Sequence, residues 1–328
     1  MGGPPAAVAT VRRAVRRHLE EFPSGALILV ACSGGADSLA LAAATAFVAP
    51  RLGLRAGAMT VDHGLQEGSA QRAAALLPTL RRLGLDPVDL HTVRVGRAGG
   101  PEGAARRARY AALDSGAEAH GAESVLLGHT RDDQAETVLL RLARGSGARS
   151  LAGMSPCSGR YRRPLLDVDR STVRNACAQM GLTAWEDPHN RDPAYARSRV
   201  RSQALPILEE TLGPGVAAAL ARSADLLRDD AAALDDAAAQ ALDRCRHPGG
   251  GADLAVLAEL PRAVRTRVLR QLAVAAGVPE GALGAVHIHA LDRLVTHYRG
   301  QSHVDLPGRV CGRRRHGCLF VEHTDRSE

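Results

Sequence analysis

A short, continuous apolar run near the start of the chain, Ala26 to Ala31, predicts a strand buried on both faces of a parallel sheet. It leads directly into a polar, glycine-rich turn, Ser33 to Ser38, and apolar residues then resume as a helix over Leu39 to Phe47. A strand, a glycine-rich turn and a helix start together form a phosphate cradle, because backbone amides, hydroxyls and the positive helix end can face the anion. A simple turn would not need two serines, two glycines and an aspartate at these offsets.

Short apolar runs continue to alternate with helical periods up to about residue 213. This alternation predicts a doubly wound parallel α/β sheet, preceded by an amphipathic helix at the amino end. Further strands are expected at 54–61, 88–95, 124–128 and 182–186, and further helices at 71–83, 101–119, 171–180 and 197–212, the last kinked or divided at Pro206.

The strongest break in the pattern is Gly213-Pro214-Gly215. It divides the chain into a predicted catalytic domain, residues 1–213, and a smaller, mainly helical C-terminal domain, residues 214–328. In the second domain helices are expected at 216–245, 261–276 and 284–298, with short strands near 302–322.

The glycine-rich turn is not a Walker A loop. The chain contains no lysine, so all 42 of its basic residues other than histidine are arginines and a Gly-Lys-Ser/Thr motif is absent. Transfer of a γ-phosphate of the Walker type is therefore not expected. Asp37 would lie among phosphate oxygens, where a carboxylate requires a cation such as Mg²⁺ between them.

Polar residues also follow the second and fourth predicted strands. Asp62 and His63 come directly after the second strand and His129 after the fourth. Open α/β sheets bind ligands at these carboxyl ends, so the three side chains are candidates for ligand contacts. A turn with a helix cap explains Asp62 and His63 equally well.

Asp132, Asp133 and Glu136 begin the helix that follows the fourth strand. Asp133 and Glu136 share a helical face, and two converging carboxylates can hold an ammonium group and later take its proton. The same spacing is a capping-box-like helix start, and on residue types alone the two interpretations are equally good. Capping does not explain why His129 and Gln134 crowd the same turn.

The segment from Thr137 to Leu166 contains six arginines and no acidic residue, with glycine and serine between them. Such a segment suits a nucleic-acid phosphate backbone, although a solvated surface is the ordinary alternative. The arginines that we expect to contact such a phosphate backbone are Arg141, Arg144, Arg149, Arg160 and Arg162.

The composition indicates the kind of binding partner and the cellular compartment. A net charge of +7 and a pI near 9.6 suit a polyanionic partner. Six scattered cysteines without a C-x-x-C pair, and no signal peptide, predict reduced thiols in the cytoplasm. No apolar run approaches the length of a membrane span. The histidines and cysteines between 287 and 323 do not have the spacing of a compact zinc site, so ordinary surface and core positions are favoured.

Further short motifs accompany those above: Ala108-Arg109-Tyr110, Leu142 to Gly147, Leu151 to Met154, Arg163 to Leu166, Trp185 to Asn190 and Ala196 to Arg201. Together these motifs resemble the tRNA(Ile)-lysidine synthetases, a family of the PP-loop ATP pyrophosphatase superfamily. The resemblance is dense over roughly residues 25–210 and weak beyond, where Leu306-Pro307-Gly308 carries it. Departures are Thr130, His189 and Ser198, where the family often has His, Ser and Asn.

The resemblance implies ATP-dependent ligation of free lysine to the wobble cytidine of an isoleucine tRNA with a CAU anticodon. ATP would first adenylate the 2-carbonyl oxygen of the base and release pyrophosphate, and the lysine ε-amine would then displace AMP. The implied ATP-binding residues are Ser33, Gly34, Gly35, Ala36, Asp37, Ser38, Asp62, His63 and His129, with Asp37 as the Mg²⁺ ligand. The implied catalytic residues are Asp37, Arg109, Asp133, Glu136 and Arg201, and Asp133 and Glu136 would bind lysine. Arg106, Arg107 and Arg199 are close alternatives to the two arginines.

Two other functions stay open at this point. A PP-loop tRNA thiolase also adenylates a base carbonyl, but it needs a sulfur carrier, for which paired cysteines are usual. A tRNA-binding protein with a relic nucleotide loop would need none of Ser33, Asp37, Asp133 and Glu136. The sequence does not fix the oligomeric state, and a homodimer remains an alternative.

Overall fold

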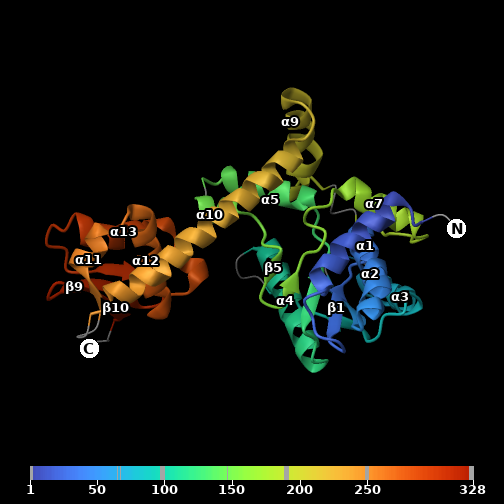
Figure 1. The fold of residues 1–328 in the computed structure, drawn as a ribbon, viewed down its shortest axis with the longest axis horizontal. Helices are drawn as coiled ribbons and strands as arrows, with labels where there is room; N and C mark the ends of the chain where they lie inside the picture. Colours follow the sequence, from blue (N-terminus) through green and yellow to red (C-terminus); the bar gives the residue numbers. More distant parts are fainter. Residues whose placement is uncertain are drawn as a thin grey trace. The chain divides into compact units, whose positions relative to one another are not determined.

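The computed structural model describes residues 3–64, 66, 68–96, 100–145, 147–187, 192–247 and 251–324 (Figure 1). The motif residues Leu65, Ser146 and Pro188 to Asn190 lie outside this description. The chain forms two compact units, Met1–Leu227 and Arg228–Glu328, each with its own hydrophobic core. Within the described ranges, no helix combines the length and apolarity needed to cross a membrane.

The first unit contains a sheet with the strand order β3-β2-β1-β4-β6-β5, in which every neighbouring pair is parallel except β5 and β6. The central strand is apolar on both faces, because Ile28 and Val30 enter one core cluster while Leu27 and Leu29 enter the other. The strands are β1 (Leu27–Ala31), β2 (Arg55–Asp62), β3 (Val88–Thr92), β4 (Ser124–Leu127), β5 (Cys157–Ser158) and β6 (Tyr161–Arg162).

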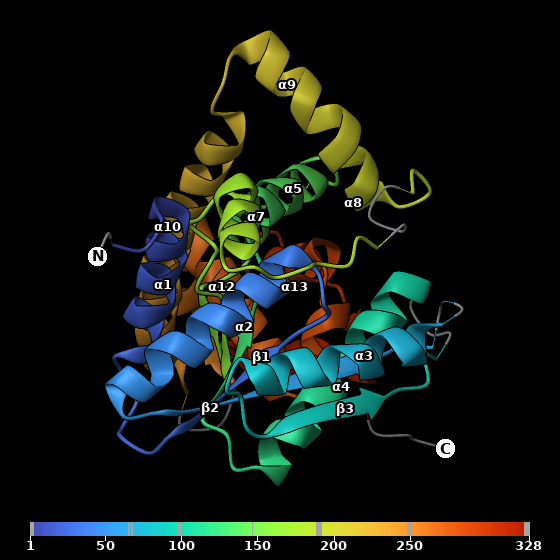
Figure 2. The same cartoon turned by 90° about the vertical axis from the view of Figure 1, so that its right-hand side faces the viewer.

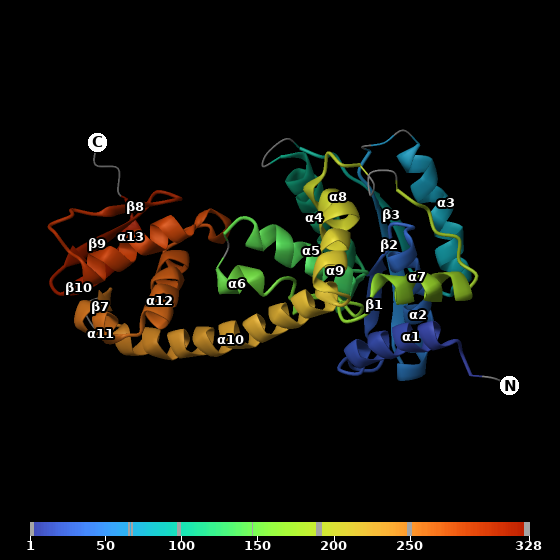
Figure 3. The same cartoon turned by 90° about the horizontal axis from the view of Figure 1, so that it is seen from above.

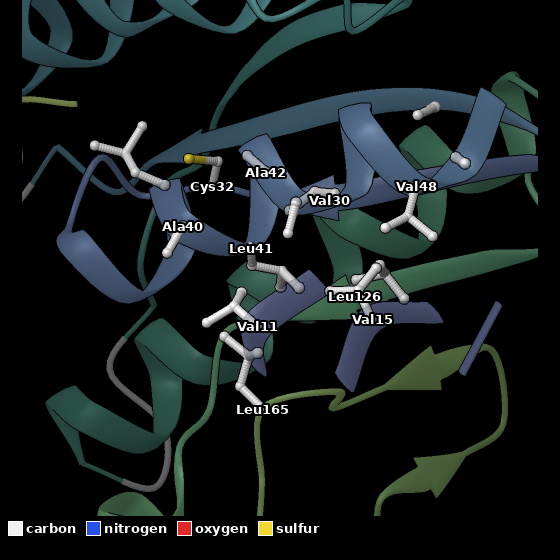
Figure 4. Packing of buried hydrophobic residues seen from close by; sticks show 14 of the residues in the cluster. Val11, Val15, Val30, Cys32, Ala40, Leu41, Ala42, Val48, Leu126 and Leu165 are labelled. Carbon is white, nitrogen blue, oxygen red and sulfur yellow. The ribbon is translucent and has the colours of Figure 1, made fainter. Parts of the chain in front are cut away.

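Helices cover both faces of this sheet (Figure 2), which confirms the predicted doubly wound fold. On one face α1 (Ala6–Leu19), α2 (Ala36–Val48) and α7 (Arg170–Gln179) pack on one another, with α3 (Ser69–Arg82) beside them. The core there includes Val11, Val15, Leu41, Leu126 and Leu165 (Figure 4). On the other face α4 (Pro101–Ala119) packs through Leu113 and Ala117.

The predicted strand at 182–186 is wrong. This segment has no ladder partner and instead runs past the phosphate loop, where the Trp185 amide donates to the Gly34 carbonyl at 3.0 Å. The sheet continues through β6, whose Tyr161 pairs with Val125. A two-residue strand is too short to leave an alternating pattern in the sequence.

The predicted helix at 197–212 is helical in three parts: α8 (Ala196–Arg199), a π-helix (Val200–Ala204) and α9 (Leu205–Leu212). Pro206 lies in the first turn of α9 and has no amide hydrogen, so it cannot donate a helical hydrogen bond. The wider π turn lies directly before it. Arg201 lies in the π-helix and Arg197 in α8, so this irregularity sets their spacing.

The second unit is mainly helical with an antiparallel sheet of order β7-β10-β9-β8 (Figure 3). Its core includes Leu257, Leu269, Leu291 and Leu319. The two units divide inside α10 (Val216–Cys245), whereas the predicted boundary at Gly213 to Gly215 lies directly before that helix. The other elements are α11 (Leu254–Glu259), α12 (Arg262–Ala275), α13 (Ala285–Thr296), β7 (Ala252–Asp253), β8 (Val304–Leu306), β9 (Val310–Arg315) and β10 (Cys318–His323).

Candidate active site

Three polar segments lie at the carboxyl ends of three adjacent strands. The phosphate loop, Ser33–Ser38, follows β1, while Asp62 and His63 close β2 and the segment His129–Asp133 follows β4. The strand order reverses between β1 and β4, and open sheets bind ligands at such a switch point. The fold therefore brings the phosphate loop and the segment His129–Asp133 to the same edge of the sheet.

The phosphate loop is held in shape by its own serine. The Ser38 hydroxyl donates to the Gly35 carbonyl at 2.9 Å and accepts from the Ser33 amide at 3.2 Å. Gly34 has φ +84°, where a side chain would strain the backbone, and a Cβ at Gly128 would lie 3.2 Å from the backbone of Asp37, which would have to shift by a few tenths of an ångström. The loop leads into the first turn of α2, whose amides have no carbonyl partner within the helix and suit an anion.

Asp37 carries a carboxylate oxygen that suits a cation. Its Oδ1 is buried without a hydrogen-bond partner. Burial, and then the nearby Asp133, raise the pKa of Asp37 to about 6, although Arg170 opposes the shift. Among the described residues no group of three His, Cys, Asp or Glu could hold a metal by itself. A Mg²⁺ ion at Asp37 would therefore take its other ligands from phosphate oxygens and water.

The raised pKa gives a testable pH dependence. Because the pKa of Asp37 rises from 3.8 to about 6 on folding, its contribution to stability is complete below pH 3.8 and is lost as the pH rises through 6. We expect Asp37→Asn, measured without nucleotide, to raise the Tm at pH 7.5 by a few degrees, for a gain on the order of 2 kcal/mol. The gain should shrink toward pH 4 in melting curves. An equal gain at both pH values would contradict the assigned shift.

Asp133 and Glu136 lie in the first turns of α5 (Arg131–Leu142), and both capping and ion pairing are present. Asp133 Oδ2 accepts from the Thr130 amide at 2.8 Å, and the Thr130 side chain accepts from the Asp133 amide, which together form the capping box. The Thr130 hydroxyl also lies 3.0 Å from Asp133 Oδ2. The other oxygen of Asp133, Oδ1, faces arginine side chains. Glu136 is fully buried, so its charge requires partners.

Three arginines supply these partners. Arg170 Nη2 lies 2.9 Å from Asp133 Oδ1 and 3.0 Å from Glu136 Oε1. Arg201 lies 3.0 Å from Asp133 Oδ1 and 2.7 Å from Glu136 Oε1, and Arg197 Nε lies 3.2 Å from Glu136 Oε2. Burial alone would raise the pKa of Asp133, but Arg170 and its other partners outweigh burial and lower it. Asp133 is therefore ionised, and the oxygens of both carboxylates are occupied by guanidinium groups.

A second group combines an arginine with two neutral histidines. Burial is the main cause that lowers the pKa of His63, and it lowers the pKa of His129 to about 3, with Arg109 adding to both shifts. The Nδ1 atoms of both histidines and the Nε of Arg109 are buried without hydrogen-bond partners. These groups can donate to or accept from a bound molecule. Asp62 instead accepts from the Gly64 amide at 3.0 Å, which is a turn contact.

The predicted RNA-binding arginines fall into three classes. Arg144 and Arg149 are exposed. Arg141 donates to the carbonyls of Ser150 and Gly153, which anchors the loop around α6 (Ala148–Leu151). The remaining two have acidic partners within the protein: Arg160 lies 3.3 Å from Glu118, and Arg162 lies 2.9 Å from Glu21.

Sequence reasoning missed Arg170 and the ion-pairing role of Arg197. Arg170 begins α7, just after the Arg163-Pro-Leu-Leu motif, and lies at least 34 residues from its acidic partners. The available signal was indirect: two buried carboxylates need cations, and this region is rich in arginine. No periodicity singles out which arginine would provide them.

The cysteines do not form reactive pairs in the described residues. Five of the six are buried and Cys157 is exposed. Burial raises the pKa of Cys32, beside the phosphate loop, and raises that of Cys177 to about 11, which disfavours the thiolate. The C-terminal histidines and cysteines likewise form no three-residue metal cluster among the described residues.

Comparison with known proteins finds a family model for each of two parts of the chain. A PP-loop domain family matches residues 8–208, and the TilS substrate binding domain matches residues 253–320. A tRNA(Ile)-lysidine synthase from Thermobifida fusca is 66% identical over 98% of this chain and 99% of its own length. A tRNA(Ile)-lysidine synthase from Streptomyces coelicolor is 57% identical over 97% of this chain and 99% of its own length.

A solved structure shares much of the fold of this chain. The U34-tRNA thiolase NcsA from Methanococcus maripaludis, with its [4Fe-4S] cluster, aligns with a TM-score of 0.57 and 19% identity. The alignment covers 68% of this chain and 80% of the thiolase, and at this identity it shows the fold alone. The two domain matches and the full-length relatives decide the family: the chain belongs to the tRNA(Ile)-lysidine synthases, PP-loop ligases that form a carbon–nitrogen bond.

Proposed function

We propose that this protein ligates free lysine to the wobble cytidine of the isoleucine tRNA with a CAU anticodon, in two steps in the cytoplasm. The observation that carries the proposal is the meeting of a phosphate cradle and the carboxylate pair Asp133 and Glu136 at one switch point, bridged by Arg170. The identity to lysidine synthases over nearly the whole chain supports the same substrates.

In the first step the phosphate loop binds the phosphates of ATP. The amides and hydroxyls of the loop face the anion, and Asp37 would hold Mg²⁺, which would neutralise phosphate charge. The base oxygen attacks the α-phosphorus, the bond to the β-phosphate oxygen breaks, and pyrophosphate leaves. The residues proposed for ATP binding are Ser33, Gly34, Gly35, Ala36, Asp37, Ser38, Asp62, His63 and His129.

In the second step lysine replaces AMP on the base. Asp133 and Glu136 hold the ε-ammonium, a role that suits a carboxylate whose pKa is lowered. One carboxylate of the pair takes a proton from the ammonium, the ε-nitrogen bonds to carbon 2 of the base, and the carbon–oxygen bond to AMP breaks, so that its electron pair leaves with AMP. Arg109 and Arg201 bind the phosphate of the adenylated intermediate, and the unpartnered Nε of Arg109 supports this role.

The arginine segment contacts the tRNA in this proposal, and Arg144 and Arg149 test it most directly because they are exposed. We expect Arg144→Ala with Arg149→Ala to lower the slope of log affinity against log salt by about two units, near one for each phosphate contact. The matched double variant, Arg160→Ala with Arg162→Ala, should change it less, because these two side chains are less exposed and lie against Glu118 and Glu21. Filter binding at several salt concentrations measures the slopes. An unchanged slope in the first variant would mean a solvated surface.

Analysis of the modified base tests the proposed function as a whole. The protein is incubated with ATP, labelled lysine and isoleucine tRNA, and the tRNA is digested to nucleosides. We expect label in a single modified cytidine, with AMP and pyrophosphate formed in equal amounts. Incorporation of sulfur from an added donor would instead indicate a thiolase, and tRNA binding without any modification would indicate a binding protein.

A further inference from the structure

Arg170 contacts both the phosphate loop and the carboxylate pair. Its Nη2 contacts Asp133 and Glu136, and its Nε lies 3.9 Å from Asp37 Oδ2 in the phosphate loop. The side chain is 12% exposed, so its interactions are made largely out of water. It begins α7, which packs on α2, the helix that follows the phosphate loop.

The nitrogens of this guanidinium differ in the hydrogen bonds that they make. One nitrogen, Nη2, serves two carboxylates, while Nε is buried without a hydrogen-bond partner. Burial alone would lower the pKa of Arg170, but Asp133, Glu136 and other carboxylates outweigh burial and raise it, so the group stays charged. The Nε–H of Arg170 is a charged donor without an acceptor, and it lies beside the phosphate cradle. Phosphate oxygens bound there would give it a charged acceptor.

We propose that Arg170 is a positioning residue that makes lysine binding depend on bound ATP. Without nucleotide, its guanidinium occupies the carboxylate oxygens that the lysine ammonium needs. With nucleotide, it turns toward the phosphates and gives up its contacts with Asp133 Oδ1 and Glu136 Oε1. The ammonium takes the position that it vacates, beside Arg201, which contacts the same two oxygens. This inference rests on the proposed function, because it takes lysine and ATP as the two ligands.

The charges favour this exchange. Asp37, Asp133 and Glu136 are close to three guanidiniums, from Arg170, Arg197 and Arg201, so an added ammonium would meet a site that is already neutralised. A triphosphate adds several negative charges next to Asp37, and one guanidinium can then move to them without leaving the carboxylates unpaired once lysine arrives. Lysine and ATP therefore each improve the site for the other.

Lysine binding to the full-length protein without tRNA tests the inference. Lysine affinity is measured by calorimetry in two conditions, with Mg²⁺ and α,β-methylene-ATP together and with neither. This analogue cannot release pyrophosphate. We expect lysine to bind about 10- to 100-fold more tightly with the analogue, and lysine to tighten the binding of the analogue by the same factor. Equal lysine affinity in both conditions would overturn the inference, and this wild-type measurement holds whether or not a variant folds.

Variants assign the effect to Arg170. In Arg170→Ala the two lysine affinities should become equal, and Arg170→Lys should restore part of the difference because it keeps the charge. Arg174→Ala is the matched control, since it removes a charge that also acts on Asp37 from the same helix. It should keep the nucleotide dependence. A dependence that survives in Arg170→Ala, or is lost equally in Arg174→Ala, would contradict the assignment.

Different results would overturn the proposed function and the role of Arg170. If the protein makes no lysidine from ATP, lysine and tRNA, the proposed function is wrong. If it makes lysidine but binds lysine equally well with and without the nucleotide analogue, only the role of Arg170 is wrong.

Discussion

Replacing Asp37 with asparagine should abolish ATP-dependent pyrophosphate release while the protein stays folded and binds tRNA. The amide keeps the size of the side chain but loses the charge of the buried, unpartnered oxygen that suits Mg²⁺. Loss of an electrostatic group of this kind lowers kcat by about 100- to 1000-fold, and loss of the cation would add to this. The measurement is pyrophosphate release at saturating ATP and tRNA, beside tRNA affinity.

Stability separates this loss from unfolding. The same variant is expected to melt at a higher temperature than the parent at pH 7.5, because the parent carboxylate is ionised against a raised pKa. Asp89→Asn is a suitable control, since Asp89 pairs with His120 and belongs to no part of the site. It should release pyrophosphate at close to the parent rate. Near-normal release by Asp37→Asn would remove the phosphate loop from the mechanism.

Local features of the site could be predicted from the sequence because their causes are local. The buried strand β1, the turn after it and the first turn of α2 are contiguous, and their apolar and glycine pattern fixes the cradle without distant contacts. The same holds for Thr130 and Asp133, which are three residues apart and form a capping box.

The ion pairs around Glu136 could not be predicted in the same way. Its partners Arg170 and Arg201 lie 34 and 65 residues further along the chain, and any of many arginines could have supplied the charge. Their positions depend on how α7 and the π-helix pack against α5, which no local pattern encodes. The two-residue strands β5 and β6 were missed for a related reason, since only pairing with β4 defines them.

The last prediction concerns Asp133, where capping and lysine binding compete as explanations. In Asp133→Asn the amide oxygen can still accept from Thr130, so the cap should survive. The amide nitrogen would then face Arg170 and Arg201, which lose their acceptor on this residue. We therefore expect a loss of stability on the order of 3 kcal/mol, more than the cap alone would give.

The lysine dependence of the reaction decides between the two explanations. If Asp133 holds the ε-ammonium, the variant loses a charge-assisted hydrogen bond of roughly 1.5–3 kcal/mol, and the KM for lysine should rise on the order of 10- to 100-fold. Pyrophosphate release should persist, because adenylation of the base does not involve lysine. Asp132→Asn is the matched control: it lies on the same turn, and its amide can still accept from the Arg170 backbone, so the KM should not change. A folded Asp133→Asn protein with the parent KM for lysine would leave Asp133 with the helix cap and the ion pairs alone.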